Sequence, residues 1–341
     1  NVRERQRAEI NPMQYGTIVH YILERFFGEY TKEEYLSLEE DKLQKIVCAY
    51  LAEYAVKYFG EEQLESNSFT YRLKTILDNV MHLMKHIMEE LSQSEFFVAD
   101  CELKIGEDIP SYTIVLPDGH KIAVCGSVDR VDIMQRADIT YLRIIDYKTG
   151  TKQFKLSDIL YGINLQMLLY LHSIEASGGD KYGEIVPAGI LYMPATVPYI
   201  SSDSLKSIDK LPDELNKKLK MNGLLLKDTE IIHGMDKTDV ATYIPVKIKA
   251  GEPVSSTSLA TLAEFGKIFK KVDMLIAEMG KNIYNGNIEA KPLKGGHDSC
   301  EYCPYDSVCA YRQSNPITCF SVDNKTVIEE ITNEINGKEE E

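Results

Sequence analysis

The order of elements in this 341-residue chain predicts an α/β or α+β fold built on one mixed β-sheet. Three observations carry the prediction. Residues 12–91 show helical periodicity, residues 96–147 read as successive strands, and residues 157–193 read as a helix followed by a strand. Helices, then antiparallel strands, then a crossover unit are typical of one sheet covered by helices.

Three amphipathic helices are predicted first. Apolar residues recur at helical spacing over residues 12–30, 38–59 and 69–91. Gly60 and the polar residues 66–68 separate the second helix from the third. The segment 30–95 therefore reads as helical throughout.

The strands follow. They are predicted at residues 96–105, 112–116, 121–128, 131–134 and 141–147. Residues 117–119, Pro-Asp-Gly, form a hairpin turn between the second and the third. Residues 157–175 return to helical periodicity and 185–193 form a further strand. Residues 194–255 are rich in loops, and a long helix is predicted at 259–284.

Composition limits the function. The net charge of −15 argues against a free-standing nucleic-acid binder, although Lys148, Lys152 and Lys155 form a local basic group. No apolar run approaches 18 residues and no signal-peptide pattern is present, so a cytoplasmic protein without a membrane helix is expected. The acidic end, residues 321–341, is predicted to be a disordered tail.

A carboxylate and an amine lie two residues apart at the end of a predicted strand. Because side chains alternate between the faces of a strand, Asp146 and Lys148 are expected to point one way and Tyr147 the other. Asp129, at the end of another predicted strand, supplies a second carboxylate. Two carboxylates suit a hard divalent cation, and a lysine can orient a nucleophile. An ordinary surface ion pair would show the same D-x-K pattern.

Three further patterns accompany this pair. Gly126 permits a close approach of backbone to a site. Gln166 and Tyr170 share one helix face as polar exceptions in an apolar segment. His20 follows Gly16 by one helical turn, and a neutral imidazole can ligate a metal. Each pattern also fits a purely structural role.

Three clustered cysteines form a C-x₂-C-x₅-C pattern at Cys300, Cys303 and Cys309. Without a secretory signal, ligation of zinc or an iron–sulfur cluster is favoured over a disulfide framework. Three thiolates need a fourth ligand, and His297 and Cys319 are nearby candidates. Three free thiols are the alternative.

In this order, the G-x-x-x-H, G-x-x-D-R-x-D, D-Y-K-T-G, Q-x-x-x-Y and cysteine motifs resemble the RecB-like branch of the PD-(D/E)XK nucleases. They resemble in particular the C-terminal nuclease domains of the AddB family, one of the two components of bacterial ATP-dependent helicase–nucleases, a likeness to which residues 222–226 add. The resemblance implies a restriction-endonuclease-like α/β core with a central mixed sheet flanked by helices over residues 1–320. Within it, 30–95 would be a helical insertion and 295–320 a cysteine-rich iron–sulfur segment.

The resemblance also implies roles for the motif residues. His20, Asp129 and Asp146 would bind Mg²⁺ or Mn²⁺, and the catalytic set would be Asp129, Asp146, Lys148, Gln166 and Tyr170. The implied reaction is exonucleolytic hydrolysis of single-stranded DNA during double-strand break repair by homologous recombination. The implied partners are the DNA strand and the other, AddA-like component of the helicase–nuclease. A helicase that delivers the DNA would also explain how an acidic domain acts on it.

The cysteines depart from the family pattern in one respect. In the family, three C-terminal cysteines join one cysteine upstream of the G-x-x-x-H helix to hold a [4Fe–4S] cluster. Cys300, Cys303 and Cys309 match the three, but no cysteine precedes Cys48. The chain is therefore expected to be a fragment of a longer protein, with the cluster incomplete or absent.

Two other functions stay open. A stand-alone, CRISPR-associated RecB-like exonuclease would share the motifs, but such chains are usually shorter, and the segment 30–95 does not favour them. A catalytically silent nuclease fold could serve as a DNA-binding or structural module. The intact set of Asp129, Asp146 and Lys148 argues against the silent module.

Overall fold

One mixed sheet organises the part of the chain that the computed structural model describes, residues 10–60, 64–150, 152–197, 211–255, 257–305, 308–309 and 316–339. Its strand order is β1-β4-β5-β6-β7-β10. The bounds are β1 Phe97–Ile105, β4 Gly126–Arg136, β5 Ile139–Lys148, β6 Glu184–Pro194, β7 Asn222–Leu226 and β10 Leu259–Ala260. The pairs β1–β4, β4–β5 and β6–β7 are antiparallel, whereas β5–β6 and β7–β10 are parallel. This arrangement confirms the predicted α/β fold with a mixed central sheet.

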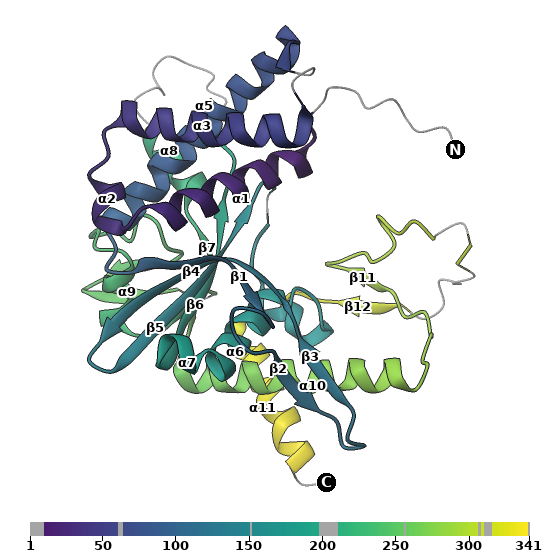
Figure 1. Ribbon diagram of the computed structural model, residues 1–341. Coiled ribbons are helices and arrows are strands. Elements are labelled where there is room, and N and C mark those ends of the chain that lie inside the picture. Colours follow the sequence, from purple (N-terminus) through teal and green to yellow (C-terminus); the bar gives the residue numbers. More distant parts are fainter. Residues whose placement is uncertain are drawn as a thin grey trace.

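Helices cover both sides of the sheet (Figure 1). One side carries α1 Pro12–Glu29, α2 Lys32–Leu36, α3 Glu40–Phe59 and α5 Asn67–Ser92. The other side carries η1 Leu156–Tyr161, α6 Gln166–Ser177, α7 Gly179–Tyr182, α10 Leu262–Tyr284 and α11 Asn324–Glu339. Two shorter helices, α8 Leu211–Leu219 and α9 Thr229–Met235, contact β6 and β7 respectively. Among the described ranges, no helix combines the length and apolar character needed to cross a membrane.

Three small two-stranded sheets complete the described structure. Their strands are β2 Tyr112–Val115 with β3 Lys121–Val124, β8 Lys247–Lys249 with β9 Glu252–Val254, and β11 Leu293–Gly295 with β12 Ile317–Cys319. The first two pairs are antiparallel, and the third is parallel.

Local sequence explains how α1 presents its polar face. Asn11 caps the helix, because its side chain accepts a hydrogen bond from the backbone N–H of Gln14. The Gln14 side chain in turn accepts one from the backbone N–H of Asn11. Pro12 occupies the first helical turn, where its missing N–H costs nothing. The apolar stripe from Ile18 to Phe26 is fully buried. Burial of that stripe fixes the rotation of α1 and leaves His20 at the border of the core.

The strand that carries Asp129 differs from the prediction. Residues 121–128 were expected to form one strand ending just before Asp129, but the chain breaks at Cys125. β3 turns away into a hairpin with β2, and β4 starts at Gly126 and runs to Arg136. The prediction that Asp129 ends a strand is therefore wrong, because Asp129 lies inside β4 and is held by neighbouring strands on both sides.

The crossover between β5 and β6 also differs in detail. The single helix predicted at 157–175 is divided, since η1 ends at Gly162 in a left-handed conformation with φ +68°. Asn164 adopts a second positive φ of +54° before α6 begins. The break makes Gln166 the first residue of α6. The parallel β5–β6 pair confirms the predicted crossover unit.

The prediction of a disordered acidic tail is wrong for residues 324–339, which form α11. Val327, Ile331 and Ile335 recur at a spacing of four residues and are buried. Lys271 in α10 reaches across to Glu334, with 2.6 Å between Nζ and Oε2. Glu329 and Glu330 are exposed on the outer face of α11, while the apolar stripe packs on the fold, where α11 contacts α10 and η1.

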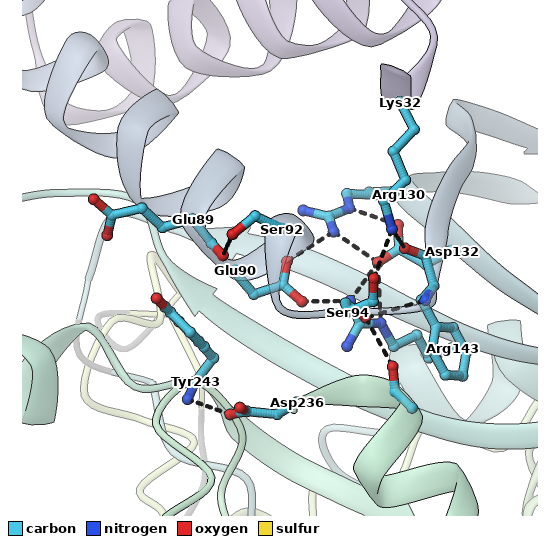
Figure 2. A network of polar contacts seen from close by, with 12 residues as sticks. Lys32, Glu89, Glu90, Ser92, Ser94, Arg130, Asp132, Arg143, Asp236 and Tyr243 are labelled. Atoms are coloured by element: carbon cyan, nitrogen blue, oxygen red, sulfur yellow. Dashed lines mark hydrogen bonds and ion pairs between the residues drawn. The ribbon is translucent and has the colours of Figure 1, made fainter. Parts of the chain in front are cut away.

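A buried network of four charges joins α5 to the sheet (Figure 2). Glu90 accepts from Arg130 at 3.2 Å and from Arg143 at 2.5 Å. Asp132 accepts from Nε of Arg130 at 2.6 Å and from Nε of Arg143 at 3.0 Å. All four side chains are fully buried, and two positive charges balance two negative ones. We call Glu90, Arg130, Asp132 and Arg143 the buried charge network.

Candidate active site

The strand registers bring polar side chains from neighbouring strands to one level of the sheet. Asp146 in β5 pairs with Tyr192 in β6, and Tyr192 pairs with Asn222 in β7. The register of β4 with β5 places Asp129 opposite Asp146. The register of β1 with β4 places Glu102 opposite Asp129. We call Glu102, Asp129, Asp146, Tyr192 and Asn222 the cross-strand row.

The D-Y-K motif has the geometry that alternation predicts. Asp146 and Lys148 form an ion pair on one side of β5. Tyr147 points to the other side, where it is buried. Its backbone N–H donates to Oδ2 of Asp129 at 2.9 Å. The motif thus pairs its own two charged groups and fixes the carboxylate of the neighbouring strand.

His20, Glu102 and Asp129 form a group with ligand atoms within 4.8 Å of one another. Nδ1 of His20 lies 2.9 Å from Oε1 of Glu102, and Nε2 lies 3.7 Å from Oδ2 of Asp129. It is the one such group of His, Cys, Asp or Glu side chains in the described ranges. One imidazole nitrogen and two carboxylates fit a divalent cation of the Mg²⁺ or Mn²⁺ kind. Asp146 lies outside this group and is paired with Lys148 instead.

Electrostatics at this group favour a bound cation. Burial raises the pKa of Asp129 to about 6, and the negative charges of Asp146 and Glu102 add to the rise against the opposing effect of His20. Burial alone would lower the pKa of His20, but its bond to Glu102 and the charge of Asp129 raise it overall. Carboxylates crowded in a partly buried place repel each other until positive charge arrives.

Glu102 is a functional candidate that the sequence did not reveal. It lies in the middle of β1, outside every recognised motif, and its φ is +50°. Few non-glycine residues adopt a positive φ, and such strain gathers at functional sites. Ser127 donates to its second carboxylate oxygen at 2.9 Å, which holds the side chain toward His20. The only sequence signal was an acidic residue within a predicted strand.

The two remaining predicted site residues, Gln166 and Tyr170, lie at the start of α6. Nε2 of Gln166 is 3.4 Å from the hydroxyl of Tyr170, as expected for one helix face. Tyr170 packs directly on Gly126, where an added Cβ would lie 2.1 Å from the tyrosine hydroxyl. Gly126 therefore permits close approach, as predicted, but of a side chain from α6. A Cβ added at Gly16 would lie 3.8 Å from the methyl group of Thr149, an ordinary contact distance, so this glycine is not required by packing.

A pocket of about 590 Å³ opens beside the metal-ligand group. Its lining includes His20 and Glu102 of the ligand group, together with Tyr54 and Tyr58 of α3. The centroids of the Tyr54 and Tyr58 rings are 4.4 Å apart, and Tyr58 is 56% exposed. We call this space the tyrosine pocket.

The cysteines do not assemble into a ligand group in the described structure. Cys300 and Cys303 are half-buried and Cys309 is exposed, and all three are free thiols. Cys319 ends β12 and pairs with Gly295 of β11. The part of the segment between Tyr305 and Val308, like residues 310–315, lies outside the described residues.

The chain is similar to known nucleases over most of its length. The family model described as the PD-(D/E)XK nuclease superfamily matches residues 1–310. The chain is 34% identical over 321 residues, 91% of its length, to the B subunit of the ATP-dependent helicase/deoxyribonuclease of Thermoanaerobacter sp. (strain X514). The proteins of the same name from Clostridium acetobutylicum and Alkaliphilus oremlandii are 32% identical over 91% and 97% of the chain. The chain spans 28–30% of the length of these relatives.

Proposed function

Because the chain belongs to the PD-(D/E)XK nuclease superfamily, we propose that it is a metal-dependent deoxyribonuclease domain that hydrolyses single-stranded DNA as an exonuclease. The observation that carries the proposal is the His20–Glu102–Asp129 group next to the Asp146–Lys148 pair on adjacent strands. By analogy with the helicase/deoxyribonuclease relatives, the DNA strand would come from a helicase in a complex with an AddA-like partner, during double-strand break repair in the cytoplasm.

The residues divide into three roles. His20, Glu102 and Asp129 would hold Mg²⁺ or Mn²⁺, with Asp146 as a further ligand once the ion offsets its repulsion from Asp129. Such an ion, when bound, lowers the pKa of coordinated water and neutralises charge on a phosphate. Lys148 would orient the attacking water and stabilise negative charge that develops on the phosphate. Gln166 and Tyr170 would complete the site and position the strand.

Metal binding tests the proposal against a silent nuclease fold. Titration calorimetry of the wild-type chain with Mn²⁺ is expected to show binding at or below millimolar concentration. Asp129→Asn is expected to weaken that binding at least about tenfold, because loss of a group that supports a metal site typically costs 10–100-fold. Asp138→Asn, in the exposed turn between β4 and β5, removes the same charge far from the ligands.

Two calorimetric results would contradict the proposed metal site. If millimolar Mn²⁺ or Mg²⁺ gives no heat with the wild-type chain, or if Asp138→Asn lowers affinity as much as Asp129→Asn, the group is not a metal site. A DNA-binding or structural module would then be the better assignment.

The tyrosine pocket supports the choice of single-stranded DNA. An unstacked base can lie on an exposed aromatic ring, whereas a base inside a duplex keeps its neighbours on both faces. Tyr58 offers such a ring within the pocket that also holds His20 and Glu102. A base stacked there would extend from a strand whose phosphate lies at the metal-ligand group.

Tyr58→Ala is expected to weaken binding of single-stranded DNA by about tenfold, since base stacking on an aromatic side chain is worth ~1–3 kcal/mol. Fluorescence anisotropy with a labelled oligothymidine measures the change. Tyr58→Phe keeps the ring and should bind like the wild type. Tyr71→Ala, which removes a 72% exposed tyrosine from α5, is the control for a general surface effect. Equal affinities of Tyr58→Ala and the wild type would remove the base-stacking role.

We also propose that Cys300, Cys303 and Cys309 hold three corners of a [4Fe–4S] cluster when the upstream part of the longer protein supplies the fourth. This rests on the spacing of the three cysteines and on the chain's similarity to proteins more than three times its length.

A further inference from the structure

A basic groove of about 740 Å³ lies beside the N-terminal end of β7. Four of its nine lining residues are lysines, namely Lys217, Lys220, Lys247 and Lys249. None of the nine is Asp or Glu, although the chain carries a net charge of −15. The groove therefore concentrates positive charge on a protein that is otherwise acidic. We call it the lysine groove.

The positive charge in the lysine groove is available to a ligand. Lys217, Lys247 and Lys249 are exposed, and none of them joins an ion pair within the described ranges. Lys220 is half-buried, and its ammonium donates to the carbonyl oxygens of Ala241 at 2.6 Å and Val246 at 3.1 Å. Burial lowers the pKa of Lys220; the charge of Asp236 opposes the fall, and that of Lys247 adds to it.

Two acidic residues close to the groove, Glu252 and Asp236, also accept hydrogen bonds from neutral groups. Glu252 lies opposite Lys249 in the β8–β9 hairpin, but its carboxylate accepts from the hydroxyl of Thr229 at 2.8 Å. Asp236 accepts from the backbone N–H groups of Thr238 and Tyr243 at 3.0 and 2.7 Å. Their charges offset part of the positive charge of Lys220 and Lys249, and an external polyanion would relieve the repulsion that remains among the lysines.

The groove adjoins the cross-strand row along the chain, at the start of β7. Met221, which lines it, directly precedes Asn222, the last member of the row. Asn222 accepts from the N–H of Phe154 at 2.7 Å and donates to the carbonyl of Lys152 at 3.0 Å. The ammonium of Lys152 in turn lies 4.9 Å from the centre of the Tyr192 ring. The loop after β5, which carries Lys152, is thus tied to the first residue of β7, next to the groove.

The distance suits one strand of nucleic acid. Two strand spacings of ~4.8 Å separate β5 from β7, so the backbone at the start of β7 lies roughly 10 Å from that of Asp146. Phosphates adjacent to the one being cut would fall within this range.

We propose that the lysine groove binds the phosphate backbone of the single DNA strand on one side of the cleavage site, which makes it a second, sequence-independent contact for the substrate. The inference rests on the proposed function. It commits to DNA because the repeated negative charge of a phosphate backbone complements the four lysines that line one groove. An acidic protein segment would match the charge but has no reason to start at the catalytic row.

Salt-dependent DNA binding tests the inference. The triple variant Lys217→Gln/Lys247→Gln/Lys249→Gln is made in an Asp146→Asn background, so that the DNA is not cut. Its affinity for a long oligothymidine is expected to fall at least about tenfold at low salt. Loss of three phosphate contacts should reduce the slope of log affinity against log salt by about 2, because each contact to a single strand contributes roughly 0.7.

The control matches the charge change. Lys42→Gln/Lys45→Gln/Lys74→Gln, in the same background, removes three exposed lysines from α3 and α5. If both triples weaken binding and flatten the salt slope equally, net charge alone is responsible and the inference is overturned. An unchanged affinity and slope for the groove triple would overturn it as well.

Substrate length separates this inference from the proposed function. A thymidine dinucleotide is too short to reach from the Asp146–Lys148 pair into the groove. Mg²⁺-dependent cleavage of that dinucleotide by the wild-type chain therefore tests the nuclease assignment alone. In the otherwise wild-type background, the loss of activity caused by the groove triple should grow with oligonucleotide length. A loss that is equal for short and long substrates would place the lysines outside the substrate path.

Discussion

Replacing Asp146 with Asn is expected to abolish DNA cleavage while leaving the chain at least as stable as the wild type. The substitution keeps the volume and removes one charge from the Asp146–Lys148 pair beside the metal-ligand group. Loss of one preorganised electrostatic contact to a transition state commonly costs about 10²–10³-fold in rate. Stability should not fall, because Asp146 raises the pKa of Asp129 by repulsion and Asn relieves it.

Both quantities can be measured on the same preparations. Cleavage of labelled oligothymidine in Mg²⁺ gives the activity, and urea unfolding gives the free energy of unfolding. Lys148→Met should lose activity to a similar degree, whereas Asp138→Asn should keep both properties of the wild type. DNA cleavage at the wild-type rate by Asp146→Asn or Lys148→Met would refute their catalytic roles. A marked loss of stability in Asp146→Asn would show that the carboxylate serves the fold.

Glu90→Gln is expected to destabilise the fold by about 3–5 kcal/mol, which is the usual cost of removing one partner from a buried ion pair. Glu90 is fully buried and accepts from both Arg130 and Arg143, so the substitution leaves a net positive charge inside the protein (Figure 2). Burial opposes ionisation of Asp132, but the two guanidinium groups hold its pKa below the usual value. Asp132 alone cannot balance two arginines.

Urea unfolding again supplies the measurement. Glu89→Gln is the matched control, because Glu89 is the preceding residue of α5 and lies outside the buried charge network. The double variant Glu90→Gln/Arg143→Met removes one charge of each sign and should recover part of the lost stability. A cost below about 1 kcal/mol for Glu90→Gln would mean that water or a shifted side chain satisfies the arginines.

The motif around Asp129 shows what the sequence could predict and what it could not. Alternation along β4 places Arg130 and Asp132 together in the buried charge network, and the predicted pairing of Asp146 with Lys148 is observed. The partners of Arg130 were out of reach, because Glu90 lies 40 residues away on a helix that packs on the sheet. One motif therefore supplies both a candidate metal ligand and a structural charge pair.

Two failures have a common cause. Glu102 escaped notice because its meeting with His20 joins residues 82 apart and depends on a positive φ that no propensity predicts. The end of the strand before Asp129 was misplaced because residues 121–128 alternate as one strand would, while the break at Cys125 follows from the hairpin with β2. Both features are set by tertiary contacts rather than by local pattern.

The prediction of a disordered acidic tail was wrong for a different reason. Its charge was read as a sign of disorder, yet Val327, Ile331 and Ile335 have the spacing of a helix stripe. Periodicity is the more direct signal, because it reports whether a helix has something to bury. Glu334 also forms an ion pair with Lys271 of α10.

Because the cross-strand row depends on strand register, the proposed nuclease site can form only when the sheet is correctly paired. A slip of one residue in the pairing of any strand turns its side chains to the other face. Such a slip would separate Asp129 from Asp146 or Glu102 and dismantle the ligand group at once. The parallel pairing of β5 with β6 also requires the long crossover between them to close. An incompletely folded chain would therefore not cleave DNA. Cleavage would indicate that the strands of the sheet have paired in the correct register.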